Sequence, residues 1–237
     1  MSISDDLIVD VAKILSQKWD HADGRVVPSN TDLPLTGGSR RLDATILYSD
    51  LAQSSTLVTD FQQRTAAKVV RCFLSCMCKL ITSNGGEVTS FDGDRVMGVF
   101  VGDSKNTSAT TCALQMNYAV LEIIGPWVKR HFDSAKQTPF EIAHCVGVDT
   151  GSVLVVKAGQ RGSNDLVWIG RPANLAAKLS DLRELNYHSY ITRDVFSRLP
   201  HSAKFGGIPE RLMWEERRFS FAGESLTVHR SNWTWKP

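Results

Sequence analysis

The chain has 237 residues, of which 42% are apolar and 22% are charged, a composition typical of a soluble globular protein. Its 27 basic and 25 acidic residues leave a net charge of +2, which gives no bulk electrostatic basis for binding nucleic acid. No apolar run reaches the roughly 18 residues that cross a bilayer, and the acidic N-terminus does not resemble a secretory signal, so we expect a cytoplasmic protein with no membrane partner. The spacing of the five cysteines matches no zinc site, and neither a structural metal nor a disulfide is expected.

The first 41 residues predict an N-terminal helix followed by a linker, and one catalytic domain is expected from residue 42 to residue 237. Residues 4–18 begin with Ser4 as a candidate N-cap and carry apolar side chains on one helical face. These side chains are Leu7, Val11, Ile14 and Leu15. Such a helix could pack on the core, form a dimer contact or act as a regulatory arm. We expect one of the first two. Residues 19–41 contain prolines and glycines among polar residues, which is typical of a linker.

The run Ala44–Tyr48 is β-branched and aromatic, which predicts a buried strand that ends at Ser49-Asp50. Small polar residues follow, including Ser54 and Ser55, and lead into a helical region that begins at Leu57 and ends near Asn84. Free backbone N–H groups at the start of that region could receive a triphosphate.

Two apolar segments, Glu87–Phe91 and Arg95–Phe100, flank Asp92-Gly93 and predict a hairpin with a type I′ turn, which needs positive φ at both central residues. Asp94 then lies just past the hairpin tip. If the hairpin pairs with the strand before Asp50, two carboxylates converge at one edge of a sheet. Carboxylates with no His or Cys nearby suit hard cations, Mg²⁺ or Mn²⁺, which in turn hold phosphates. The alternative is that Asp50 caps a helix and the hairpin is an ordinary surface turn.

Two further segments complete the middle of the chain. Residues 104–132 predict a second long helical stretch, interrupted at Gly125-Pro126. Asp149-Thr150-Gly151, within a run of alternating apolar residues, predicts another hairpin. Toward the C-terminus, short strands alternate with one helix near residues 193–199.

A strand gives way to a helix near residue 170. Gly170 breaks the strand, and Pro172 suits a first helical turn. Asn174 and Lys178 are four residues apart and therefore share one face of that helix. The alternative is that Asn174 is a capping residue and Lys178 a solvated charge.

Taken together, these segments resemble class III nucleotidyl cyclase catalytic domains over about residues 42 to 230, in the family's order. Tyr48-Ser49-Asp50 and Phe91–Phe100 are similar to the two metal-binding motifs, and Val146–Gly151 is similar to the central strand and turn. Asn174 and Lys178 match the transition-state motif, in which an Asn and a basic residue four positions later face the nucleotide. The family usually has Arg where Lys178 stands, and Lys keeps the charge but loses the bidentate fork.

The resemblance implies an α/β (α+β) fold, a ferredoxin-like βαββαβ unit with a central, mainly antiparallel sheet, and a head-to-tail homodimer with shared active sites. Asp50, Asp94 and the backbone carbonyl of Leu51 would hold two ions, Mn²⁺ or Mg²⁺, in one subunit. Asn174 and Lys178 would come from the other subunit, to orient the ribose and to stabilise charge on the α-phosphate. The reaction implied is in-line attack of the ribose 3′-OH on the α-phosphate, with pyrophosphate leaving.

Substrate choice in this family depends on the position four before the second metal-binding Asp and the position seven before the Asn. Adenylyl cyclases tend to carry Lys at the first and Asp or Thr at the second, and guanylyl cyclases tend to carry Glu and Cys. This chain has Ser90 and Val167 instead, with Tyr48 where Phe is frequent. A base pocket that is partly filled by the Tyr48 side chain, with the short Ser90 hydroxyl to contact the base, suits a ring smaller than a purine. Arg171, Ser54 and Ser55 complete the candidate substrate-binding residues, and Arg217 and Arg218 lie near the family's Lys for the outer phosphates.

These departures resemble the pyrimidine cyclases of bacterial Pycsar antiphage systems, which make cyclic UMP or cyclic CMP on infection and activate a separate effector. We therefore predict that UTP, or CTP, is converted to the 3′,5′-cyclic nucleotide and pyrophosphate, as a second messenger for defence by abortive infection. UTP is the preferred substrate of this hypothesis. Two alternatives stay open: a bacterial class III adenylyl cyclase with unusual base contacts, and a non-catalytic nucleotide-binding module, which the intact Asp50 and Asp94 disfavour.

Overall fold

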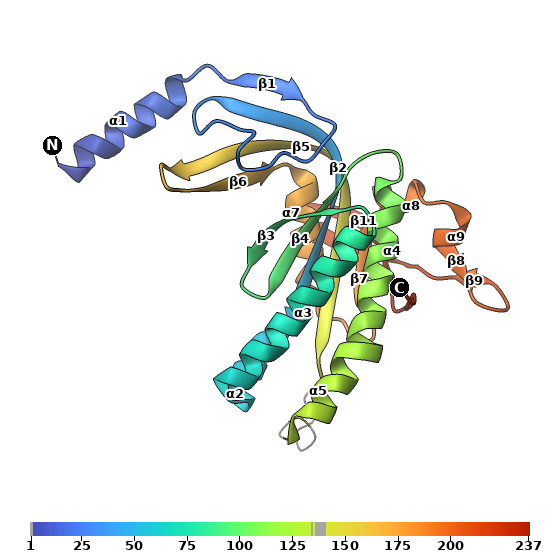
Figure 1. Ribbon diagram of the computed structural model, residues 1–237. Coiled ribbons are helices and arrows are strands. Elements are labelled where there is room, and N and C mark those ends of the chain that lie inside the picture. Colours follow the sequence, from blue (N-terminus) through green and yellow to red (C-terminus); the bar gives the residue numbers. More distant parts are fainter. Residues whose placement is uncertain (1, 134, 136–140) are drawn as a thin grey trace.

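The computed structural model describes residues 2–133, 135 and 141–237 (Figure 1). A large sheet runs in the order β10-β11-β7-β5-β2-β4-β3, with β1 paired to β2 and β6 paired to β5. Its strands are β1 (Asp20–Asp23), β2 (Gly38–Ala52), β3 (Glu87–Asp92), β4 (Arg95–Phe100), β5 (Ala143–Gln160), β6 (Ser163–Ile169), β7 (Ser189–Thr192), β10 (Glu215–Phe221) and β11 (Glu224–Ser231). Only the β1–β2 and β5–β7 pairs are parallel, so the mainly antiparallel α/β sheet expected from the sequence is confirmed.

Helices connect these strands. They are α1 (Ile3–Ser16), α2 (Ser54–Asp60), α3 (Gln63–Ser83), α4 (Lys105–Tyr118), the π-helical η1 (Ala119–Ile124), α5 (Gly125–His131), α7 (Arg171–Ser180), α8 (Arg193–Ser197) and α9 (His201–Lys204). A small separate ladder joins β8 (Phe205–Gly206) to β9 (Arg211–Leu212). Among the described residues, no helix is both long and apolar enough to cross a membrane.

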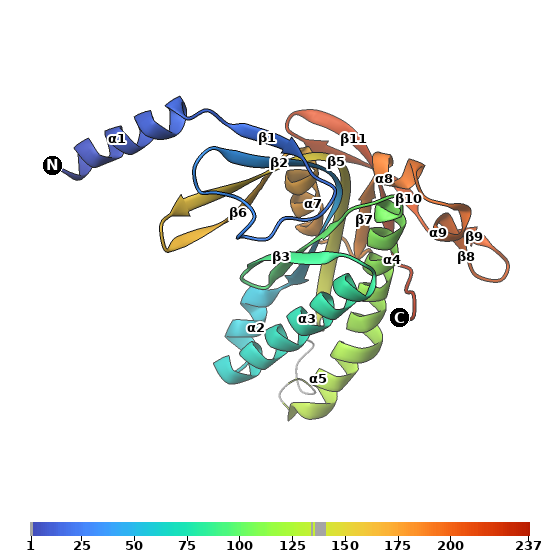
Figure 2. The ribbon, with the colours of Figure 1, turned by 45° about the horizontal axis from the view of Figure 1, so that its top comes forward.

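The centre of the sheet is covered on both faces. On one face α3 and α4 lie against the strands, and Phe73 and Met77 of α3 pack in the same buried cluster as Leu47 of β2 (Figures 1 and 2). On the other face α7 packs on β2 and β5, where Ala176 and Ile46 belong to a second cluster. Because a strand with two buried faces has no polar side, the apolar run Ala44–Tyr48 does not alternate.

The expected hairpin at Asp149-Thr150-Gly151 is wrong. β5 runs without a break from Ala143 to Gln160, and the chain reverses only at Arg161-Gly162, where Gly162 has a φ of +87°. Thr150 pairs with Thr45 of β2 within a ladder of fourteen residue pairs, so backbone pairing overrides the local turn signal.

The expected interruption at Gly125-Pro126 is also displaced. The helical backbone continues through both residues, and the irregularity lies before them, in the π turn Ala119–Ile124. The Gly125 N–H donates to the carbonyl of Val120, five residues back. A widened turn at this point accommodates the ring of Pro126, which would clash with the fourth preceding carbonyl of a regular α-helix.

The N-terminal segment differs from the expectation in two ways. Helix α1 is capped by Ser2, whose side chain accepts from the Asp5 N–H in a capping box, and not by Ser4. No residue of α1 is buried, so it does not pack on the core as expected. Residues 19–41 are not a free linker, because β1 pairs with β2 and both Val27 and Leu33 are buried in the core cluster of Ile46. A boundary at residue 42 therefore falls inside β2.

Candidate active site

The two predicted metal-binding carboxylates lie at the same end of the sheet. Asp50 pairs with Arg95 in the last described pair of the β2–β4 ladder, and Asp94 directly precedes Arg95 in the turn that joins β3 to β4. Of the two central residues of that turn, only Gly93 has a positive φ, of +61°. The turn thus has the pattern of type II′ and not of the expected type I′. Asp94 occupies its second central position.

Asp50 is 6% exposed, and two guanidinium groups surround its carboxylate. The Arg183 side chain donates a hydrogen bond of 2.5 Å to Asp50 Oδ2, and Arg95 Nε lies 3.5 Å from Oδ1. Arg183 also donates to the carbonyls of Ser180 and Leu182 just past the end of α7. The structure therefore ties the end of α7 to the strand that carries Asp50.

Sequence reasoning missed both arginines. Arg95 directly follows Asp94 in the hairpin motif, but its place opposite Asp50 depends on the register between β2 and β4, which the hairpin turn does not set. Arg183 had no local signal, since 133 positions separate it from Asp50.

Asp94 has a different environment. Its Oδ2 atom is buried and has no hydrogen-bond partner in the part of the chain that the structure describes. An unpaired buried carboxylate oxygen is costly unless a cation or donor joins it. Two carboxylates at one sheet end, one of them with an unpaired oxygen, fit a hard divalent cation, with a backbone oxygen such as that of Leu51 added.

The described residues contain no group of three or more His, Cys, Asp and Glu side chains that could enclose a metal ion. A site with one or two carboxylates is nevertheless usual for Mg²⁺, which takes its remaining ligands from water and substrate phosphates. The Leu51 side chain is buried in the core cluster, so only its backbone could take part.

Two of the three candidate base-contacting residues lie together on the same face as Asp50. Tyr48 and Ser90 both pair with Met97 in the β2–β4–β3 ladder, so their side chains lie on the same face of the sheet. Burial raises the pKa of the Tyr48 hydroxyl, and the nearby Asp92 carboxylate adds to that rise. Val167 does not join them. Its neighbour Trp168 is buried in the Ile46 cluster on their face, so Val167 projects from the opposite face of β6.

A glycine positions helix α7. A Cβ atom at Gly147 of β5 would lie 2.1 Å from the Ala176 carbonyl oxygen and 2.6 Å from the Ser180 nitrogen, so only glycine permits this close approach. Pro172 lies in the first turn of α7, as the sequence predicts, and the apolar face of the helix is buried against the sheet.

The opposite face of α7 faces the β10–β11 hairpin and carries Arg171, Asn174 and Lys178, at positions i, i+3 and i+7. Asn174 and Lys178 line an open pocket with residues 219–222. Arg171 lines a second cleft, of about 250 Å³, with Arg193, Arg218 and Asp194, and its guanidinium forms an ion pair of 3.1 Å with the Asp194 carboxylate. Arg218 thus lies near Arg171, whereas Arg217 forms an ion pair with Glu184.

The described contacts do not bring Asn174 or Lys178 against Asp50 or Asp94. Instead, a series of charges links the two groups of residues. Lys178 Nζ lies 3.9 Å from Asp181, Asp181 pairs with Arg95, and Arg95 reaches Asp50. The pocket beside Asn174 and the sheet end beside Asp50 are therefore separate regions of the chain, linked only through these charged side chains among the described residues.

His144 lies next to the sheet end that carries Asp50. Its buried environment leads us to expect that the folded protein is less stable at acidic pH. The residue is paired with Leu51 in the sheet, and both of its ring nitrogens are buried without a hydrogen-bond partner in the described structure. Burial, with smaller contributions from His188 and Arg183, lowers the pKa of His144 to about 3. Because the unfolded chain takes up a proton near pH 6.5 and the folded chain does not, stability falls as the pH drops from about 6.5 toward 3, by up to about 1.4 kcal/mol per pH unit.

Thermal melts between pH 7.5 and pH 4.5 test this expectation. The variant His144→Phe should melt at the same or a higher temperature at neutral pH and should show a shallower pH dependence. The exposed-ring variant His201→Phe is the matched control and should keep the wild-type slope. Equal slopes in His144→Phe and wild type would contradict the assignment.

Comparison with known proteins agrees with this geometry. The chain is 43% identical over 237 residues to a uridylate cyclase of Rhodovulum sp. (strain MB263), covering 100% of this chain and 99% of that relative. It is 38% identical to a uridylate cyclase of Xanthomonas perforans, with the same coverage. No family model matches the chain.

Solved structures agree on the fold. The adenylyl cyclase CyaB from P. aeruginosa superposes with a TM-score of 0.67 at 18% identity, over 81% of this chain and 95% of that chain. The guanylyl cyclase Cya2 also gives 0.67 at 18% identity, over 83% and 95%.

The sheet, the paired carboxylates and these superpositions define a class III nucleotidyl cyclase catalytic domain, and the resemblance found in the sequence is confirmed. Given its identity of 43% and 38% to full-length relatives, the chain belongs to the uridylate cyclase family.

Proposed function

We propose that the chain is a pyrimidine nucleotide cyclase that converts UTP to 3′,5′-cyclic UMP and pyrophosphate. The observation that carries the proposal is the 43% identity, over the whole of both chains, to a protein named uridylate cyclase. Intact Asp50 and Asp94 at one sheet end support turnover rather than nucleotide binding alone. The absence of a Lys and acid pair at positions 90 and 167 speaks against a purine-reading site.

Asp50, Asp94 and the Leu51 carbonyl would hold Mn²⁺ or Mg²⁺, two ions per site. Such ions make the ribose 3′-hydroxyl more acidic and neutralise the departing pyrophosphate. The buried, unpaired Asp94 Oδ2 supports this assignment, because it is an acceptor that the protein itself leaves without a donor.

The remaining steps belong to the polar face of α7. The Asn174 amide would hold the ribose so that the 3′-oxygen lies in line with the α-phosphate. Fixing this geometry lowers the entropic cost of bringing the two reacting groups together. The Lys178 ammonium would stabilise the charge that grows on the α-phosphate oxygens. Arg171, with Arg218 nearby, would bind the outer phosphates of the nucleotide, and the N–H groups near Ser54 and Ser55 would add donors. The separation of Asn174 from Asp50 within one chain supports a head-to-tail homodimer in which each copy completes the other's site.

Recognition of the base would fall to Tyr48 and Ser90. Both lie on the Asp50 face beside Met97, where they place hydroxyl groups instead of the longer side chains that read purines. A wrong base would leave these polar groups buried and unpaired, which is costly and makes discrimination between substrates strong. The two hydroxyls therefore favour a small ring whose edge groups can pair with them. Val167 would contribute only from a second copy of the chain.

Incubation of the purified protein with Mn²⁺ and each of the four ribonucleoside triphosphates tests the function. We expect cyclic UMP as the main product, identified by mass spectrometry, with pyrophosphate in equal amount. Cyclic AMP as the main product would contradict the proposal and favour an adenylyl cyclase. No product from any nucleotide, with UTP still bound, would favour a non-catalytic module.

We further propose that the cyclic nucleotide is a second messenger that activates a separate effector in antiphage defence. Cells that carry the chain should accumulate cyclic UMP after phage infection, measured in extracts over the first infection cycle. Constant nucleotide levels during infection would contradict this role while leaving the enzymatic proposal intact.

A further inference from the structure

Helix α1 is an amphipathic helix without a packing partner in its own chain. Six apolar side chains share one helical face and all are exposed: Ile3, Leu7, Ile8, Val11, Ile14 and Leu15. In both views of the ribbon α1 extends away from the rest of the molecule, next to β1 (Figures 1 and 2). An exposed apolar stripe of this length marks an interaction surface.

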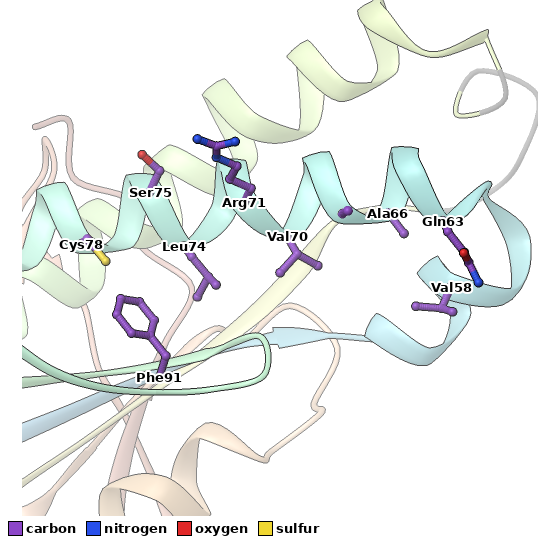
Figure 3. Close-up of a pocket in the computed structure, with 10 residues that line it drawn as sticks. Val58, Gln63, Ala66, Val70, Arg71, Leu74, Ser75, Cys78 and Phe91 are labelled. Carbon is purple, nitrogen blue, oxygen red and sulfur yellow. The ribbon is translucent and has the colours of Figure 1, made fainter. Parts of the chain in front are cut away.

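An apolar groove lies on another part of the molecule, between α2, α3 and the β3–β4 hairpin. It has a volume of about 620 Å³ and is lined mainly by apolar side chains. Figure 3 shows Val70 and Leu74 of α3 and Phe91 of β3 pointing into it, with Val58 of α2 at its end. Phe91 and Val58 are 58% and 57% exposed, so the groove is open to a partner.

The groove and α1 match in length. The α3 side chains that line the groove extend from Gln63 to Cys78, a span of about 23 Å at the helical rise, and the 14 residues of α1 span about 21 Å. Helix-in-groove recognition uses anchors at this spacing, as Leu7, Val11 and Ile14 provide.

The groove and α1 also match in charge. Asp6 and Asp10 lie along one edge of the apolar face of α1, whose charged residues are three Asp and one Lys. Arg71 of α3 lines the groove, Arg64 lies two turns earlier on the same side of the helix, and Lys68 lies between them toward the neighbouring pocket beside α5. All three are exposed, and α3 contains no acidic residue. Within the described part of the chain, none of these three cations forms an ion pair, so they are available to an acidic partner.

We propose that α1 of one copy docks in the α2–α3 groove of a second copy, so that the two copies exchange their N-terminal helices. The short connection disfavours docking in the helix's own groove, because residues 17–19, which join it to β1, span only about 10 Å, and α1 lies well apart from α2 in both views (Figures 1 and 2). A membrane surface is a poor alternative, since interfacial helices are rich in Lys and Arg and α1 is acidic. A reciprocal exchange is isologous and closes as a dimer.

This contact does not depend on the proposed function, because none of its residues belongs to the candidate active site. Mixed-isotope cross-linking of the full chain tests it. Equal amounts of ¹⁴N- and ¹⁵N-labelled protein are mixed and treated with a carbodiimide, which joins a carboxylate to an amine in direct contact. We expect cross-links between the α1 peptide with Asp6 or Asp10 and the α3 peptide with Lys68, about half of them with one light and one heavy partner. Cross-links found only within one label would place α1 on its own chain and overturn the proposal.

Two matched substitutions on α1 give the second readout. Leu7→Asp adds a carboxylate to the apolar face, and Val9→Asp adds the same group on the opposite face, at nearly equal exposure of 58% and 57%. Leu7→Asp should remove the mixed-label cross-link and weaken self-association at least tenfold in analytical ultracentrifugation, whereas Val9→Asp should do neither.

Charge reversal identifies the groove. Arg71→Glu should weaken self-association, and adding Asp10→Lys to it should restore most of the loss. Failure of that rescue, or an equal effect of Leu7→Asp and Val9→Asp, would overturn the assignment. Flotation of wild type, but not of Leu7→Asp, with anionic phosphatidylglycerol vesicles would show that a lipid surface is the partner instead.

Discussion

Replacing Asp94 by asparagine is expected to abolish measurable cyclisation, by at least about 10³-fold, without lowering the melting temperature. The loss follows from removal of a carboxylate that would hold a divalent ion. The unchanged stability follows from the environment of the side chain, because Asp94 Oδ2 is buried without a partner and makes no contact whose loss would destabilise the fold. A neutral amide has a lower desolvation cost than a carboxylate, so the variant could melt slightly above wild type.

Asp50→Asn is the matched variant and should separate function from stability. We expect the same loss of turnover together with a lower melting temperature, since Asp50 neutralises the guanidinium groups of Arg95 and Arg183. Both arginines keep partial exposure to water, so the cost is about 1–2 kcal/mol, which is about 2–8 °C for a chain of this size.

Melting curves in chelator and in Mn²⁺ measure both effects without an activity assay. An ion that binds only the folded protein raises the melting temperature of the wild type, and this rise should disappear in Asp94→Asn and in Asp50→Asn. Equal stabilisation of wild type and Asp94→Asn by Mn²⁺ would contradict the metal assignment.

The sequence predicts the parts of the site that local signals define. The buried strand before Asp50, the hairpin that carries Asp94, and the helix that places Asn174 and Lys178 on one face all follow from runs of a few residues. Each of these elements has a pattern that tertiary packing reinforces, which is why sequence and structure agree.

The features that sequence analysis missed depend on pairing over long distances. Thr150 and Gly151 carry a turn signal, but β5 pairs with β2 along its length and stays extended. Prolines and glycines made residues 19–41 look like a linker, yet a short parallel edge strand needs only backbone pairing, and the buried Val27 and Leu33 have no regular spacing. The charges around Asp50 also depend on such long-range contacts, because Arg183, which donates to Asp50, lies 133 positions later in the sequence.

Gly147→Ala is the second substitution expected to have a large effect, although residue 147 does not touch substrate. The added Cβ would lie 2.1 Å from the Ala176 carbonyl oxygen and 2.7 Å from Leu179 Cβ, so helix α7 must move away from β5. Overpacking of this kind costs about 1–3 kcal/mol or more. Because α7 carries Asn174 and Lys178, a displacement of about 1 Å would also lower turnover by about 10²-fold.

A control and a metal readout separate this positioning role from general damage. Gly98→Ala makes the matched change on the other face of the sheet, where the three atoms nearest to the new Cβ belong to the side chain of Ile81, at 3.0 to 3.1 Å, and none to the backbone, so a smaller loss of stability and near-normal turnover are expected. In Gly147→Ala the rise in melting temperature with Mn²⁺ should persist, since Asp94 lies on the β3–β4 hairpin and not on α7. Loss of the Mn²⁺ effect, or turnover equal to that of Gly98→Ala, would show that the close approach of α7 to β5 does not position Asn174 and Lys178 for turnover.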